Sequence, residues 1–70
     1  MFYGRVSYMD RLKTLNVILL EENEDFAKNT IEFLDIYFKN IHHCSSIKNA
    51  FYIISNYKID LIISDIKLSD

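Results

Sequence analysis

Two short apolar runs in this chain each end in acidic side chains. Val17–Leu20 is followed by Glu21 and Glu22, and Leu61–Ser64 is followed by Asp65. An uninterrupted apolar run of this length is typical of a parallel strand that is covered on both faces. Ligands of open α/β sheets bind outside the carboxyl ends of the strands. The two runs therefore predict buried parallel strands that carry acidic residues at their tips.

Two amphipathic stripes lie between these runs and predict helices. The first stripe has apolar residues at i, i+4, i+7 and i+11, and it is widened by a second row: Ala27, Ile31, Leu34 and Phe38, then Phe26, Thr30, Phe33 and Tyr37. The second stripe follows two possible N-cap serines: Ser45 and Ser46, then Ile47, Ala50, Ile54 and Tyr57. A short segment between the helices, residues 41–44, predicts a third and weaker strand.

The resulting order is strand, helix, strand, helix, strand, which predicts the α/β class with parallel strands and right-handed crossovers. We expect an N-terminal extension over residues 1–15, partly helical from Tyr8 to Leu15. Residues 16–70 then form a single partial domain. Met9 is an alternative start to Met1. The lone glycine, Gly4, excludes a glycine-rich phosphate loop after the first strand.

The amino-acid composition limits the classes of binding partner and the cellular compartment that we expect. A 70-residue chain with a formal net charge of −2 and scattered basic residues does not favour direct nucleic-acid binding. No apolar run approaches the roughly 20 residues of a membrane-spanning helix. A single cysteine excludes an internal disulfide, so we expect a cytoplasmic protein without a membrane partner.

The acidic tips suggest a chemistry. If the strands 17–20 and 61–64 are neighbours, then Glu21, Glu22 and Asp65 meet at one end of the sheet. Carboxylates at such a distance resist ionising together unless a cation neutralises them. Mg²⁺ suits this site because it takes one or two carboxylates, keeps several waters and leaves room for a phosphate. Asp65 is then placed to attack phosphorus as a carboxylate nucleophile.

These residues resemble the CheY-like receiver domain of two-component response regulators. The resemblance spans about residues 16–70 and rests on three parts of the sequence: residues 17–26 (VILLEENEDF), Ala50, and residues 60–69 (DLIISDIKLS). It implies the β-α-β-α-β start of a flavodoxin-like parallel sheet with strand order 2-1-3-4-5, truncated after its third strand.

The resemblance also implies roles. Asp65 is the phosphoacceptor of a phosphoryl group from a sensor histidine kinase. Glu21 and Glu22 hold Mg²⁺ together with Asp65 and the backbone carbonyl of Lys67. Such a domain is not an enzyme but a phosphorelay switch. A downstream effector or output domain recognises its phosphorylated form. Autophosphatase chemistry is expected only in a complete domain.

The chain departs from the family pattern at several places. Glu22 stands where an aspartate is usual, and Ser69 stands where a proline is common. The switch Ser or Thr and the lysine of the family have no counterpart in this chain. We expect a truncated receiver domain whose third strand leaves a sheet edge open, with dimerisation through that edge as one consequence.

Two other functions remain open. One is a receiver-like protein-interaction module that is not phosphorylated, or an inactive fragment. The other is a fragment of a hydrolase or phosphatase that uses the same strand-tip carboxylates. A metal site at His42, His43 and Cys44 is not favoured, because adjacent strand residues point to opposite faces. Cys44 is expected to be a small buried residue.

Overall fold

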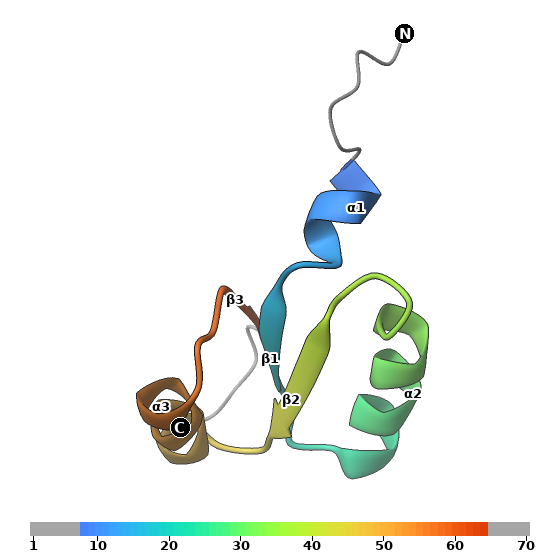
Figure 1. Cartoon of the computed structure of the whole chain (residues 1–70). Coiled ribbons are helices and arrows are strands. Elements are labelled where there is room, and N and C mark those ends of the chain that lie inside the picture. Colours follow the sequence, from blue (N-terminus) through green and yellow to red (C-terminus); the bar gives the residue numbers. More distant parts are fainter. Residues whose placement is uncertain (1–7, 65–70) are drawn as a thin grey trace, which may run out of the picture.

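The computed structural model describes residues 8–64 of the chain. They form three helices and three strands, shown in Figure 1: α1 (Tyr8–Leu12), β1 (Asn16–Leu20), α2 (Glu24–Leu34), β2 (Asn40–Cys44), α3 (Ile47–Asn56) and β3 (Leu61–Ser64). The predicted α/β class and the strand–helix alternation are confirmed. The helical part of residues 8–15 is shorter than expected and ends at Leu12.

The sheet has three parallel strands in the order β2-β1-β3. In register, Ile18 lies between His42 of β2 and Ile62 of β3, and Leu20 lies between Cys44 and Ser64. The chain must therefore cross over β1 between β2 and β3. This arrangement makes β1 the only strand with a neighbour on both sides among residues 8–64.

The core is centred on β1. Val17 and Ile18 are fully buried, and Leu19 and Leu20 are nearly so. Because side chains alternate along a strand, Ile18 and Leu20 face one side of the sheet and Val17 and Leu19 face the other. A strand that is buried on both faces explains why this run carries no polar residue.

Helix α3 covers the face of Ile18 and Leu20. Ala50 is buried together with Ile18, Leu20 and Cys44, and Ile53 packs against this cluster. Ser46 is the N-cap, as one of the two expected serines, and its hydroxyl accepts a hydrogen bond from the Asn49 N–H at 3.2 Å. Ala50 belongs to the predicted stripe, whereas Ile53 does not.

The predicted stripe of α3 is wrong in its other members. Ile47, Ile54 and Tyr57 are all exposed. Ala50 and Ile53 are three positions apart, so they lie on the same face of a helix, and they are the pair that meets the sheet.

Helix α2 meets the other face through a small residue. Ala27 is 1% exposed, whereas Phe26 and Phe33 are 59% and 67% exposed, so the prediction that these aromatic residues widen the buried stripe is wrong. The helix also ends at Leu34 and not at Phe38. Three residues of low helix propensity follow Asp35, and the N–H groups of Lys39 and Asn40 are bonded to the Leu15 carbonyl, which starts β2.

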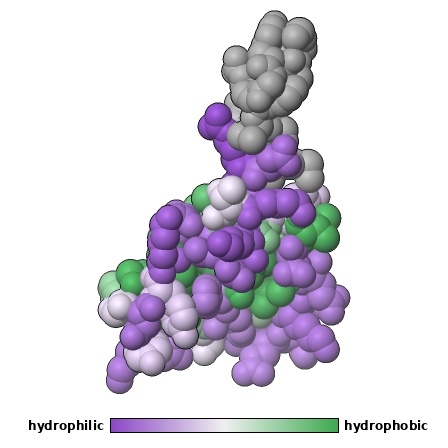
Figure 2. Space-filling view, viewed as in Figure 1, coloured by the Kyte–Doolittle hydropathy of each residue, from purple (hydrophilic) through white to green (hydrophobic). Residues whose placement is uncertain are grey.

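The surface consequently mixes hydrophobic and hydrophilic side chains. In the face shown in Figure 2, hydrophobic surface interrupts the hydrophilic surface over the body of sheet and helices. Among residues 8–64, no helix has the length and apolar character that crossing a membrane requires.

Strand β3 has the predicted bounds and direction, but the prediction that it is buried is wrong. Leu61 and Ile62 are 40% and 47% exposed, and Ile63 is half-buried. The reason is its place in the sheet: β3 pairs with β1 on one side only within the described residues. An apolar run in the sequence identifies a strand. Whether that strand is buried depends on which strands and helices pack beside it, and the run itself does not show this.

Replacing Ile18 with alanine is expected to destabilise the fold by about 2–5 kcal/mol, because it removes a fully buried side chain from the centre of the sheet. Ile36→Ala is the matched control, since Ile36 is 59% exposed. The free energy of unfolding in urea measures both. If Ile18→Ala does not fold, Ile18→Val is expected to lose about 0.5–1.5 kcal/mol. Equal losses at positions 18 and 36 would contradict the central place of β1.

Candidate functional site

The carboxyl ends of β1 and β3 lie side by side. Leu20 and Ser64, the last residues of the two strands, are partners in the parallel ladder. Glu21 and Glu22 follow β1 directly in the sequence. The predicted phosphoacceptor Asp65 and the predicted carbonyl ligand Lys67 lie outside the described residues. Of the predicted site, the structure therefore places the two glutamates.

Glu21 is held by three hydrogen bonds. Its N–H donates to the Cys44 carbonyl at 2.9 Å, which continues the pairing of β1 with β2 by one residue. Its carbonyl oxygen lies 2.9 Å from the Nε2 atom of His43. Its carboxylate oxygen Oε2 accepts the Asn23 N–H at 3.0 Å. The half-buried Glu21 is thus fixed in position, with one oxygen of its carboxylate already bonded.

Glu22 differs from its neighbour. Its side chain is exposed, and it has no hydrogen-bond partner within residues 8–64. An exposed carboxylate on a short loop can turn toward a cation without first breaking a protein contact. Glu22 is therefore the more available ligand of the predicted acidic pair.

The start of α2 adds further charge beside this loop. Asn23 is the N-cap, and its Oδ1 accepts the Phe26 N–H at 2.8 Å. Glu24 and Asp25 occupy the first turn, where the positive end of the helix dipole favours acidic side chains. These two acids therefore favour the start of α2 at this position.

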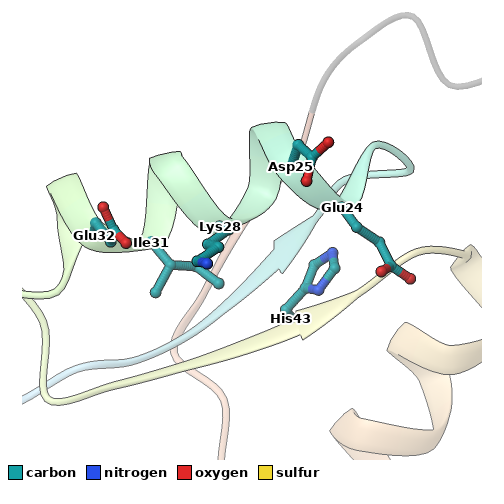
Figure 3. A pocket seen from close by; sticks show the side chains of 6 residues that line it. All are labelled: Glu24, Asp25, Lys28, Ile31, Glu32 and His43. Atoms are coloured by element: carbon teal, nitrogen blue, oxygen red, sulfur yellow. The ribbon is translucent and has the colours of Figure 1, made fainter.

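A hollow of about 380 Å³ lies between α2 and β2 (Figure 3). Its walls combine acidic, basic and apolar side chains of α2 with one imidazole of β2: Glu24, Asp25, Lys28, Ile31, Glu32 and His43. Figure 3 shows the Glu24 and His43 side chains on the same side of the first turn of α2. Four acidic or basic side chains from one helix make this a charged surface hollow.

Sequence reasoning missed the part that His43 plays. His43 pairs with Leu19 in the register of β1 and β2, so it stands next to the loop that begins at Glu21. Its ring nitrogen then meets the Glu21 carbonyl. This contact follows from the register of β1 and β2. The sequence around His42 and His43 does not specify that register by itself.

The neighbouring histidine belongs to the other face of the sheet. The His42 ring lies 5.0 Å from the Tyr57 ring, centroid to centroid, at the end of α3. His42 and His43 thus have separate surroundings. Among residues 8–64, no three His, Cys, Asp or Glu side chains are grouped closely enough to hold a metal ion.

Cys44 is 5% exposed and lies in the core beside Ile18, Leu20 and Ala50. Burial raises the pKa of its thiol, and a hydrogen bond with the backbone of Ser46 partly opposes this rise. A buried thiol with a raised pKa is a poor nucleophile, because the thiolate is the reactive form. Cys44 is therefore a packing residue.

Comparison of the chain with protein-family models, with curated proteins and with solved structures finds no match.

The raised pKa of Cys44 predicts a pH dependence of stability. The folded state favours the neutral thiol, so this contribution is complete below the ordinary pKa of 9.0 and is lost as the pH rises through the higher folded value. Comparing the free energy of unfolding of the natural chain with that of Cys44→Ala between pH 7 and pH 10.5 removes effects of other groups. The difference is expected to shrink above pH 9.0. A difference that stays constant over this range would contradict the assignment.

Proposed function

We propose that residues 16–70 carry the β-α-β-α-β part of a response regulator receiver domain with the flavodoxin-like strand order. In this proposal Asp65 accepts a phosphoryl group from the phosphohistidine of a sensor histidine kinase. Phosphorylation changes the surface that a downstream effector or output domain recognises. The chain acts as a phosphoacceptor in signal transduction and not as an enzyme with an external substrate.

The observation that carries this proposal is the parallel order β2-β1-β3 with Leu20 and Ser64 in register. The crossover from β2 to β3 reverses the direction in which strands are added, so a topological switch point lies between β1 and β3. Binding sites of open α/β sheets form at such a point, outside the carboxyl ends of the strands. Glu21 follows one strand end and Asp65 follows the other in the sequence.

The acids at the end of β1 are compatible with a magnesium ion. Mg²⁺ is commonly bound by one or two carboxylates and several waters, and the exposed Glu22 beside the fixed Glu21 offers such a pair. We propose Glu21, Glu22, Asp65 and the backbone carbonyl of Lys67 as the ligand set. When bound, the ion would neutralise the negative charge of the phosphoryl oxygens.

The proposed transfer is a displacement at phosphorus. An oxygen of the Asp65 carboxylate forms a bond to phosphorus, and the bond from phosphorus to the histidine nitrogen breaks. The electron pair of that bond stays on the imidazole. The product is an acyl phosphate, which water can hydrolyse to restore the carboxylate and release phosphate.

A second function, a receiver-like interaction module without phosphorylation, is favoured by one contact. The Glu21 carboxylate accepts the Asn23 N–H, so one oxygen of a proposed ligand is already in use. Glu22 is also one methylene longer than an aspartate, and Mg²⁺ tolerates little deviation from octahedral geometry. A measurement of Mg²⁺ binding therefore distinguishes the phosphorylated receiver from the interaction module.

Incubation of the protein with Mg²⁺ and acetyl phosphate is expected to produce a covalent phosphoryl adduct that hydroxylamine removes. Asp65→Asn is expected to abolish the adduct, because the amide lacks the nucleophilic carboxylate oxygen. Asp35→Asn, at the exposed end of α2, is the matched control and keeps the labelling. Intact-mass spectrometry measures all three proteins. Equal labelling of Asp65→Asn would exclude Asp65 as the acceptor.

A titration with Mg²⁺, followed by backbone amide NMR shifts, tests the metal site separately. We expect saturable shifts around Glu21 and Glu22, and at least a tenfold weaker affinity in Glu22→Gln, since that change removes the free carboxylate. Glu32→Gln on the exposed side of α2 is the control and should bind like the natural chain. Absence of saturable shifts in the natural chain would favour the interaction module.

A further inference from the structure

The loop between β1 and α2 is tied to β2 through both backbone groups of Glu21. The Glu21 N–H donates to the Cys44 carbonyl at 2.9 Å, which extends the ladder of β1 and β2. The Glu21 carbonyl oxygen lies 2.9 Å from the Nε2 atom of His43. The first contact joins two backbones, whereas the second depends on one side chain. His43 is therefore the residue whose identity determines how this loop is held.

The contact also assigns the hydrogen on the imidazole ring. A carbonyl oxygen can only accept a hydrogen bond, so the Nε2 atom of His43 must donate to the Glu21 carbonyl. In the neutral ring this places the hydrogen on Nε2 and leaves Nδ1 as an acceptor. A side chain that replaces His43 in this contact must consequently bring an N–H or O–H group to the same place.

The strand register brings the ring to the loop. His43 is the ladder partner of Leu19, two residues before Glu21. Its side chain lies on the α2 side of the sheet, where it lines the hollow between α2 and β2 (Figure 3). The adjacent His42 instead packs against Tyr57. Because neighbouring strand residues face opposite sides of the sheet, a slip of one residue would remove the donor from the loop.

The His43 contact reaches Glu22 through a rigid unit. The Glu21 carbonyl and the Glu22 N–H belong to one peptide group, which is planar. Holding the oxygen from β2 restrains the rotation of this plane and thereby the direction in which the chain continues to the Glu22 Cα atom. Glu22 is exposed and makes no hydrogen bond of its own within residues 8–64. Its placement therefore depends on how the backbone around it is held.

We propose that His43 is a positioning residue for the acidic loop: it holds the Glu21 carbonyl so that the carboxylates of Glu21 and Glu22 are arranged for a divalent cation before one binds. This inference rests on the proposed function, because it requires Mg²⁺ to bind at these two residues. A loop that is already arranged loses less entropy on binding. Groups that orient metal ligands commonly affect metal affinity when they are removed.

The other surroundings of the ring do not account for this contact. Charged side chains of α2 line the same hollow: Glu24, Asp25, Lys28 and Glu32. The Glu21 carbonyl is nevertheless the one hydrogen-bond or ion-pair partner of the ring among residues 8–64. His43 is exposed, so this hydrogen bond competes with water and contributes little to the free energy of unfolding. We therefore expect it to affect the arrangement of the loop more than the stability of the fold.

Titrations with Mg²⁺, followed by backbone amide NMR shifts, test this role. His43→Ala removes the donor and is expected to bind Mg²⁺ roughly threefold to tenfold more weakly than the natural chain, which is the net effect of about one hydrogen bond. His43→Gln is expected to restore the affinity, since the glutamine amide nitrogen is as many bonds from Cα as Nε2 and also donates. His42→Ala, on the other face of the sheet, is the control and should bind like the natural chain.

The heteronuclear NOE of the Glu22 amide tests the restraint without metal. This amide lies in the peptide plane that His43 holds, so its NOE is expected to fall in His43→Ala and to return in His43→Gln. The urea midpoint of unfolding should stay the same in both variants, whereas a purely structural role would lower it together with the affinity. If His43→Ala does not fold, His43→Met takes its place, because methionine matches glutamine in length and lacks the donor.

The outcomes separate this inference from the proposed function. Equal Mg²⁺ affinity of the natural chain and His43→Ala, or an unchanged NOE at Glu22, would overturn the role of His43 alone. Equal losses in His43→Ala and His43→Gln would also overturn it, because they would assign the effect to the ring and not to its donor. Absence of Mg²⁺ binding by the natural chain would overturn the proposed metal site and the role of His43 with it.

Discussion

The structure depends on the burial of β1 between two strands and two helices. Its four apolar residues, Val17–Leu20, are buried on both faces of the sheet, and its backbone bonds to β2 and β3. A chain of this length buries a smaller share of its surface than a larger domain does, so one central strand carries much of the core. Ala27 and Ala50 are the buried residues of α2 and α3, and small side chains there allow the helices to approach the sheet.

The central place of β1 also determines where chemistry is possible. Because β1 and β3 are parallel and end in register, their carboxyl ends lie side by side at one edge of the sheet, and Glu21 and Glu22 follow β1 there. Within that edge the two glutamates have different environments: Glu21 is bonded to the Asn23 N–H, whereas Glu22 is exposed.

The strands were predictable from the sequence to within one residue, because each is a short apolar run or lies between two helices. The facing of the helices was less predictable. Phe26 and Phe33 were placed in the buried stripe, but α2 contacts the sheet through Ala27, and helical periodicity cannot rank a small residue above a large one. The exposure of β3 was missed because the burial of a strand depends on its neighbours. The contact of His43 with the Glu21 carbonyl depends on strand register, which a single run of residues does not specify. The assignments to Asp65 and Lys67 stay predictions.

Amide hydrogen exchange combined with cross-strand NOEs tests whether β1 is the buried centre of the sheet. We expect the amides of Ile18, Leu19 and Leu20 to exchange most slowly. We also expect NOEs from β1 to both β2 and β3, in the parallel register that joins Leu20 to Cys44 and Ser64. Contacts between β2 and β3, or exchange in β1 as fast as in the short helix α1, would contradict it.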